Sequence, residues 1–329
     1  MAEDKELIYA VTRVHMHEAN LLGKKDFDQL LSADSVAEAF RLLADKGWGN
    51  SEIPAGDMEA LIEAETRKTW DLTAELVGNV EPFNVFRYAN DYHNLKAAIK
   101  LGYSAVGESE WGRYFLPAGT VEVEAIQKAA RERDFSFLPP AMAEAGSTAC
   151  EVLSRTGNGQ LCDITIGRAA LMAIGAAGKS AKSPLLRRYA EIIVDTANVK
   201  SAVRCLRMRK SREFIERALA TAGTLEYTAL ADAAVSGEKE AMAALLGGTA
   251  YADAIPALNE SVAAFECWCD NEIIRMIRPC RAQYFGIDPL AAFILGRENE
   301  IRMVRLILTV KTNNMSGSAL EERLRETYV

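Results

Sequence analysis

The sequence is poor in the residues that build metal sites and disulfide-bonded scaffolds. Its 329 residues contain 6 cysteines, 3 histidines and 9 prolines. No two cysteines form a Cys-x-x-Cys pair, and His15, His17 and His93 lack zinc-type spacing beside them. We therefore expect reduced, partly buried thiols and predict neither a metal nor a cofactor.

Long apolar stretches are missing as well. The longest run, Ala169 to Gly178, ends at Lys179, whereas a membrane-spanning helix needs about 18–20 apolar residues. The first residues, Met-Ala-Glu-Asp-Lys-Glu, lack the basic and then apolar order of a signal peptide. We expect no membrane span and no secretion, and a chain that is soluble when isolated.

Positive charge is scarce at both ends of the chain. The net charge of −8 (38 Lys and Arg, 46 Asp and Glu) divides into −9 for residues 1–110, +6 for 111–213 and −5 for 214–329. The acidic ends would repel phosphate, so we predict no nucleic-acid partner. The basic middle suits docking against a partner that has a charged patch of its own.

Alternating strand patterns are nearly absent, and helical patterns run from end to end. The best strand candidate, Leu161 to Ile166, is short. An N-terminal helix carries apolar residues from Leu7 to Leu22, and Gly23 would end it. Further helices are predicted at 57–77, 83–101, 185–219, 257–285 and 289–311. Predicted helix starts are a capping box at Ser35–Glu38, Ser183-Pro184, Asp288-Pro289 and a second box at Ser318–Glu321. The fold class is all-α.

A polar–aliphatic–basic triplet recurs three times at nearly equal spacing. Its copies are Asn94-Leu-Lys96, Asn198-Val-Lys200 and Glu300-Ile-Arg302, at intervals of 104 and 102 residues, each following a proline. Asp91 and Asp195 stand three residues before the asparagines, whereas the third copy has Arg297 there and Glu298 beside it. Three amphipathic helices could look alike by chance, but the spacing favours a repeat. We predict three similar lobes with approximate threefold symmetry, at about 1–110, 111–213 and 214–329, with one intertwined domain as the alternative.

Catalytic patterns are weak. Residues 173–180 fit a relaxed phosphate-loop pattern that ends in Lys179-Ser180, but no strand precedes it and Pro184 follows too soon. A nucleotide-binding enzyme using these residues stays a minor alternative. Carboxylate pairs such as Glu63 with Glu65 are better explained as solvated helix faces. We find no convincing nucleophile and base set.

The densest basic run has two readings that the sequence leaves open. It comprises Arg204, Arg207, Arg209, Lys210 and Arg212. One reading is a solvated helix end, where positive charge complements the helix dipole. The other is a docking patch for an acidic partner or for anionic lipid headgroups.

Taken together, the tripled repeat and two segments resemble a known family. The segments are Asp91-Tyr-His-Asn94-Leu-Lys96 and the C-terminal part from Glu298-Asn-Glu300-Ile-Arg302 through Ser318–Glu321 to Tyr328. They are similar to the C subunit of V-type (archaeal and bacterial A/V-type) ATP synthases, the counterpart of the d subunit of eukaryotic vacuolar ATPases. The resemblance spans essentially the full chain, although the third copy lacks the Asp–Asn pairing.

The resemblance implies a funnel-shaped, non-catalytic subunit of the central rotor, without a cofactor. Such a subunit lies peripherally on the cytoplasmic face of the membrane and links the central-stalk subunits to the membrane rotor ring, transmitting torque for ATP synthesis coupled to proton or sodium transport. The motif residues would then have structural roles: Asp91, Asn94, Lys96, Asp195, Asn198, Lys200, Glu298, Glu300 and Arg302. A free-standing helical adaptor is the other alternative. Neither the coupling ion nor the direction of the motor can be read from this chain.

Overall fold

The computed structural model describes residues 2–50, 52–54, 56–313 and 324–329. These residues form α-helices and short 3-10 helices without any strand, so the all-α prediction is confirmed. The chain forms two compact units. Unit 1 comprises Met1–Glu81 and Pro256–Val329, and unit 2 comprises Pro82–Ile255. The predicted division into three lobes remains a prediction.

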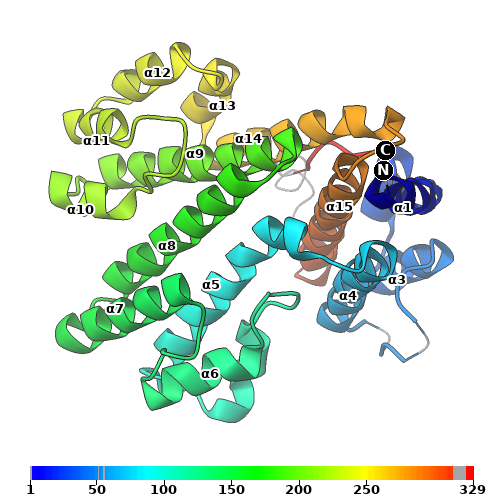
Figure 1. Ribbon diagram of the computed structural model, residues 1–329, viewed down its shortest axis with the longest axis horizontal. Helices are drawn as coiled ribbons and strands as arrows, with labels where there is room; N and C mark the ends of the chain where they lie inside the picture. Colours follow the sequence, from blue (N-terminus) through cyan, green and yellow to red (C-terminus); the bar gives the residue numbers. More distant parts are fainter. Residues whose placement is uncertain (1, 51, 55, 314–323) are drawn as a thin grey trace. The chain divides into compact units, whose positions relative to one another are not determined.

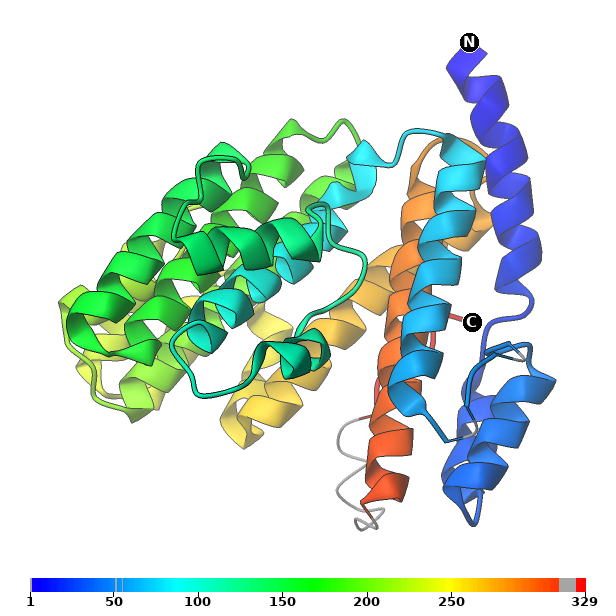
Figure 2. The ribbon, with the colours of Figure 1, turned by 90° about the horizontal axis from the view of Figure 1, so that it is seen from below.

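Unit 1 is built from both ends of the chain. Its helices are α1 (Ala2–Glu18), α2 (Lys24–Ser32), α3 (Val36–Asp45), α4 (Met58–Val77), α14 (Val262–Ile277), the 3-10 helix η4 (Arg278–Ala282) and α15 (Asp288–Thr312). The 3-10 helix η1 (Glu81–Phe83) starts at the last residue of the first segment of unit 1 and continues into unit 2. Helices α1, α4 and α15 lie side by side (Figure 2). Leu43 of α3, Leu61 of α4 and Leu308 of α15 meet in one buried core, which fixes the two ends of the chain together.

Unit 2 is a continuous segment of the chain. Its elements are α5 (Asn84–Leu101), η2 (Glu108–Tyr114), α6 (Val123–Glu132), α7 (Pro140–Thr156), α8 (Gly159–Ser180), α9 (Pro184–Arg207), α10 (Arg212–Ala218), α11 (Tyr227–Ser236), α12 (Lys239–Gly247) and η3 (Ala252–Ala254); α13 (Ile255–Glu260) begins at its last residue. Helix α8 lies between α5 and α7 on one side and α9 on the other (Figure 1). The core between α5, α6, α7 and α8 includes Leu95, Ile126, Ala149 and Ile166.

Two glycines let α8 approach its neighbours closely. A β-carbon at Gly178 would lie 2.3 Å from the β-carbon of Ala190, and one at Gly175 would lie 2.4 Å from that of Ala222. Both distances are far below van der Waals contact, so only glycine fits at these positions. The glycines of the apparent phosphate-loop pattern are therefore packing residues of a helix.

The structure corrects the strand candidate and one predicted helix, and it agrees with the sequence argument against a phosphate loop. Leu161–Ile166 is helical, because Asn158 caps α8 by accepting hydrogen bonds from two backbone N–H groups, and Cys162 and Ile166 are buried one turn apart. Residues 173–180 continue the same helix, so the preceding strand and the loop of a phosphate site do not exist there. The predicted helix at 185–219 is two helices, interrupted between Arg207 and Arg212.

The structure confirms some of the predicted helix starts and corrects others. Ser183 caps α9 and Pro184 is its first residue, as expected. Ser35 accepts from the Glu38 N–H, but the Glu38 carboxylate accepts from Asp34 rather than from Ser35. Helix α15 begins at Asp288 itself, so the expected cap is its first residue. Helix α1 ends at Glu18, before the predicted stop at Gly23, and Ser318–Glu321 lies outside the described residues.

One described helix, α8, is long and apolar enough to cross a membrane by length and composition alone. This is weak evidence, because core helices of soluble proteins pass the same test. Only 28% of the apolar window of α8 is buried in unit 2, so most of this window faces away from the core.

Candidate functional site

The first repeat copy forms a buried polar clamp on α5. Asp91 is 1% exposed and accepts hydrogen bonds from the backbone N–H of Thr120 (2.7 Å), the Thr120 hydroxyl (2.5 Å) and the N–H of Val121 (3.1 Å). One turn further on, Asn94 donates to the carbonyl of Leu116 (2.9 Å) and accepts from its N–H (2.7 Å). The two side chains thus tie the segment that precedes α6 to the middle of α5.

The second copy repeats this clamp on α9 at the same sequence distances. Asp195 accepts from the N–H (2.8 Å) and hydroxyl (2.5 Å) of Thr224 and from the N–H of Leu225 (3.0 Å), while Asn198 exchanges two hydrogen bonds with Ala220. Tyr251 adds a fourth donor to Asp195, at 2.7 Å. Asp195 and Asn198 are fully buried.

A glycine makes each clamp possible. A β-carbon at Gly119 would lie 2.4 Å from Oδ1 of Asp91, and one at Gly223 would lie 2.1 Å from Oδ1 of Asp195. The Gly-Thr pairs at 119–120 and 223–224 therefore belong to the repeat. The sequence motif left them out, although their equal distance of 28 residues from the two aspartates was a detectable signal.

The electrostatics of the clamps indicate binding of the backbone rather than proton transfer. Burial raises the pKa of Asp91, against the hydrogen bonds from Thr120 and Val121 and the charge of Arg87. Burial and the Asp195 carboxylate also raise the pKa of Tyr251 far above its ordinary value. Both carboxylates spend their acceptor capacity on protein donors, so neither is free to take a proton from a substrate.

The third copy, on α15 of unit 1, is an ionic cluster instead of a clamp. The buried guanidinium of Arg297 lies 2.7 Å from the Glu65 carboxylate of α4 and 3.0 Å from that of Glu300. Glu300 also accepts from the N–H of Leu22 and from the indole of Trp48. Burial raises the pKa of Glu300, although Arg297 and these donors oppose the shift. Arg297 thus holds two carboxylates where the other copies have an aspartate.

Asn299, which lies outside the predicted motif residues, holds the C-terminal residues of the chain. Its amide donates to the carbonyl of Glu326 (3.0 Å), and Tyr328 packs on Gly296, where a β-carbon would lie 2.6 Å from the ring. The Tyr328 hydroxyl donates to Glu18 of α1 at 2.5 Å. The third copy therefore binds a chain segment too, through a different asparagine.

The remaining motif residues lie at the edges of these clusters. Lys96, Lys200 and Glu298 are half-buried, and Arg302 pairs with Asp270 of α14 at 2.8 Å. The first two copies belong to unit 2 and the third to unit 1. Asp91, Asn94, Asp195, Asn198 and Glu300 bind the protein's own chain within their units.

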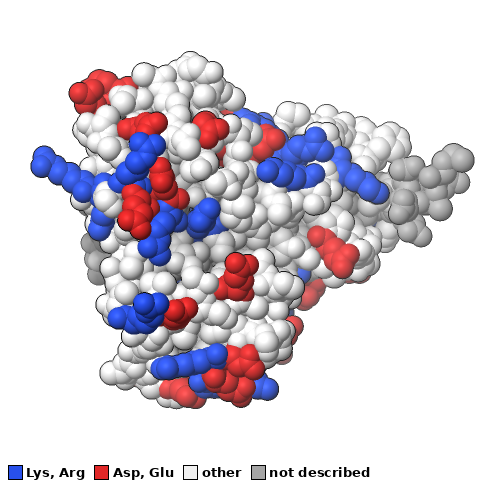
Figure 3. Space-filling model, turned by 60° about the vertical axis from the view of Figure 1, so that its left-hand side comes forward, with Lys and Arg blue, Asp and Glu red and all other residues white. Residues whose placement is uncertain are grey.

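The basic run lies where α9 ends and α10 begins. Arg204, Arg207, Arg209 and Arg212 are exposed and Lys210 is half-buried. On the face drawn in Figure 3, basic and acidic side chains stand beside one another in several groups, separated by uncharged surface. The surface in this view is thus a mosaic without one extended field of a single sign.

Four large apolar side chains of unit 1 are exposed, on two segments of the chain. Tyr9 and Met16 of α1 are 59% and 66% exposed, and Tyr284 and Phe285, between η4 and α15, are 65% and 68% exposed. The Tyr284 ring contacts the ring of His15 at 5.7 Å, which joins the two segments. We call these four residues the aromatic strip. Large exposed aromatic and methionine side chains are typical of protein interfaces.

The remaining hollows and thiols offer no clear catalytic or metal site among the described residues. A hollow of about 740 Å³ in unit 1 is lined by Lys68, Glu65 and Arg297, which already pair with one another, and one of about 400 Å³ in unit 2 is lined by Gly175, Gly178 and their neighbours. The described residues contain no group of three metal-ligating side chains. Burial raises the pKa of Cys162 and Cys280 to about 11, so these thiols are protonated and unreactive near neutral pH.

The comparisons with known proteins agree with one another. The family model of the ATP synthase (C/AC39) subunit matches residues 10–323. The C subunit of the V-type sodium ATPase of Enterococcus hirae is 22% identical, over 94% of this chain and 95% of its own length. The C subunit of the A-type ATP synthase of Methanocaldococcus jannaschii is 22% identical, over 96% of this chain and 85% of its own length. The C subunit of the V-type ATP synthase of Thermus thermophilus is 25% identical, over 61% of this chain and 63% of its own length. The chain therefore belongs to the ATP synthase (C/AC39) subunit family and is a non-catalytic subunit of a V-type ATP synthase.

Proposed function

We propose that this protein is the socket of a rotary motor. In this role it joins the central stalk to the membrane rotor ring and transmits torque between ion flow and ATP chemistry. It would lie peripherally on the cytoplasmic face of the membrane. The family match supports a rotary ATPase subunit, and the features of the structure described below suit the finer role.

A part that transmits torque must resist deformation, and the clamps supply this property in unit 2. Asp91 and Asp195 fix the segments after α5 and α9 through buried hydrogen bonds, which lose strength steeply if the geometry shifts. In unit 1 the Glu65–Arg297–Glu300 cluster joins α4 to α15. Each unit would therefore move as a stiff body.

The observation that carries the proposal is that this chain, a member of the family, exposes the four residues of the aromatic strip. Four large side chains that are more than half exposed are costly to leave in water, and they have the composition of residues that dominate binding at protein interfaces. We infer that the strip contacts another subunit of the ATP synthase. The basic and acidic mosaic of Figure 3 fits a role in assembly in the same way.

Recovery of complexes from gently solubilised native membranes tests the proposal. The tagged chain should bring down central-stalk subunits and the protein of the membrane ring. Replacing Tyr284 and Phe285 together by serine should reduce recovery of at least one of them about tenfold, because two exposed aromatic anchors are lost. Val235→Ser is the matched control, since Val235 is also an exposed apolar residue, in unit 2.

Recovery without any other part of an ATP synthase would contradict the motor role and favour the free-standing adaptor. Equal recovery from the double variant and the wild type would leave the socket in place but remove the aromatic strip as its contact surface. Circular dichroism melts of each variant show whether the fold is intact.

A further inference from the structure

The basic turn between α9 and α10 has an unusual backbone. We define the basic turn as residues 207–212. The N–H of Lys210 donates to the carbonyl of Cys205 (3.0 Å) and that of Arg209 to Leu206 (3.1 Å), the two bonds of a Schellman motif at a helix end. In this motif the residue at the position of Arg209 is left-handed and usually glycine. Arg209 has φ +48°.

The arginine at this position carries a conformational cost that glycine would avoid. A residue with a β-carbon is strained in the left-handed region, and such strain tends to persist where the side chain has a use. Arg133 offers a comparison within the same unit: it has φ +55°, and its guanidinium lies 5.1 Å from the Tyr103 ring. In the described part of the chain, Arg209 has no ring contact, ion pair or hydrogen bond through its side chain.

Some basic side chains of the basic turn have partners among the described residues and others do not. Arg212 pairs with Glu216 and Asp232, and Lys210 donates to Gln160 and lies over the Phe214 ring. Arg207 and Arg209 are exposed, and no described carboxylate lies within ion-pair distance of either. These two guanidinium groups are thus uncompensated.

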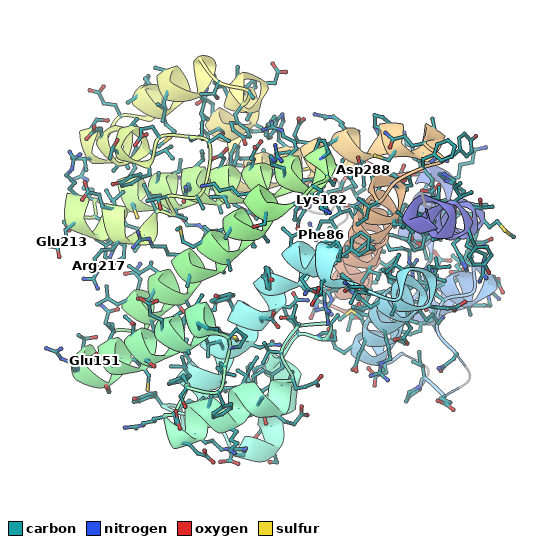
Figure 4. The ribbon with its side chains drawn as sticks, in the orientation of Figure 1. Phe86, Glu151, Lys182, Glu213, Arg217 and Asp288 are labelled. Atoms are coloured by element: carbon teal, nitrogen blue, oxygen red, sulfur yellow. The ribbon has the colours of Figure 1, made fainter. Side chains whose placement is uncertain are left out.

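The neighbouring elements do not supply the missing negative charge. Asp163 of α8 pairs with Lys100, and Glu151 of α7 pairs with Arg155. The segment 204–212 itself contains no acidic residue, and the next one along the chain is Glu213, which is exposed on α10 (Figure 4). The surface at Arg207 and Arg209 therefore keeps a net positive charge.

We propose that Arg207 and Arg209 dock an acidic segment of a partner protein. Guanidinium groups match carboxylates through two parallel hydrogen bonds, and two arginines on one tight turn suit carboxylates spaced along a helix or loop. Met208 between them is 54% exposed and offers one apolar contact. A membrane surface fits less well, because a single exposed methionine gives little to insert and the chain carries a net charge of −8.

Photo-cross-linking from position 208 in native membranes tests this inference. A benzophenone amino acid replaces Met208, and cross-linked peptides are identified by mass spectrometry. We expect a peptide of another protein with several Asp or Glu residues. The same amino acid at Val235, an exposed position on α11 away from the basic turn in sequence, is the matched control.

Arg209→Gly separates docking from folding, because glycine fits the left-handed position better than arginine. Combined with Arg207→Gln, it should lower the cross-link yield about tenfold, the loss expected for two ion pairs at the edge of an interface. Arg155→Gln, which removes another exposed arginine of unit 2, should leave the yield within about twofold.

Several outcomes would overturn the inference: a cross-link to lipid, the same peptide from position 235, an acid-poor peptide, no cross-link, or an undiminished yield in the double variant. The inference stands apart from the socket role. An acidic peptide from a protein outside the ATP synthase, together with recovery of no ATP synthase subunit, would support the docking turn and remove the proposed function, whereas recovery of the ATP synthase without this cross-link would do the reverse.

Discussion

At the scale of the residue, two glycines of the same helix differ in the space that surrounds them. Gly178 faces Ala190 with no room for a β-carbon, whereas a β-carbon at Gly167, on the exposed side of α8, would have nothing within 4 Å. From the sequence alone, both glycines are expected to weaken the helix equally. What separates them is the neighbouring helix, which a local pattern cannot show.

Gly178→Ala should destabilise unit 2 by about 1–3 kcal/mol, the range for inserting a methyl group into a filled core. Gly167→Ala should stabilise it by about 0.5–1 kcal/mol, because alanine loses less backbone entropy in a helix. Urea unfolding measures both changes in a background where Trp48, Trp70 and Trp268 are replaced by phenylalanine, so that Trp111, the one tryptophan of residues 82–255, is the fluorescent reporter. A loss of stability in the Gly167 variant would show that α8 is covered on that side.

At the scale of the element, an aspartate fixes the path of the chain between two helices. Asp195→Ala leaves the N–H groups of Thr224 and Leu225 and the hydroxyl of Tyr251 without their acceptor in a buried site. We expect a cost of about 3–5 kcal/mol, since each unpaired buried group costs about 1–3 kcal/mol and some regain water. Thr224→Val removes a single hydroxyl bond and should cost about 1 kcal/mol.

The same urea experiment with the Trp111 signal compares these two variants. If Asp195→Ala cost no more than Thr224→Val, the clamp would be peripheral to the stability of unit 2. A cost well above that of the threonine variant would establish the repeat residues as structural.

How far the sequence leads depends on the range of the forces involved. The helices, the proline at the start of α9 and the pairing of Asp91 with Asn94 on one face follow from local periodicity. The partners of those side chains lie 22 to 30 residues away, and no local pattern predicts them. The break at residues 208–211 was missed because its backbone contains an arginine where glycine is the usual signal.

At the scale of the whole molecule, a histidine connects three distant parts of unit 1. His15 lies 2.8 Å from a carboxylate oxygen of Glu18 and 2.9 Å from the carbonyl of Gln283, while Glu18 accepts from Tyr328. Both neighbours of the ring are acceptors, so both bonds form only when the imidazole is protonated. Partial burial lowers the pKa of His15, but the hydrogen bonds to Glu18 and Gln283 outweigh it and the pKa is raised.

The raised pKa makes the contribution of His15 depend on pH. A group whose pKa is higher in the folded state stabilises the fold below its unfolded pKa of about 6.5 and loses this effect as pH rises through the folded value. The stability advantage of the wild type over His15→Gln should therefore be larger at about pH 5.5 than at about pH 8.5. Urea unfolding in a Trp111→Phe background, where the remaining tryptophans all belong to unit 1, measures it.

An advantage that did not change between these pH values would show that His15 is held as the neutral ring. His17 serves as the control. Burial lowers its pKa, and its ring lies near Phe293, so His17→Gln should not reproduce the same pH dependence.

The discontinuity of unit 1 has a consequence for how the protein is made. Residues 82–255 leave the ribosome as one segment and can fold while synthesis continues, whereas the first 81 residues must wait for Pro256–Val329. The bond from Tyr328 to Glu18 spans 310 positions and forms only after unit 2 has been synthesised. During this interval the apolar side chains of α3 and α4 lack their partners on α15, and they are the natural targets of chaperones. Interrupted translation would yield chains with a finished unit 2 and an unfinished unit 1, which proteases can recognise and remove before assembly.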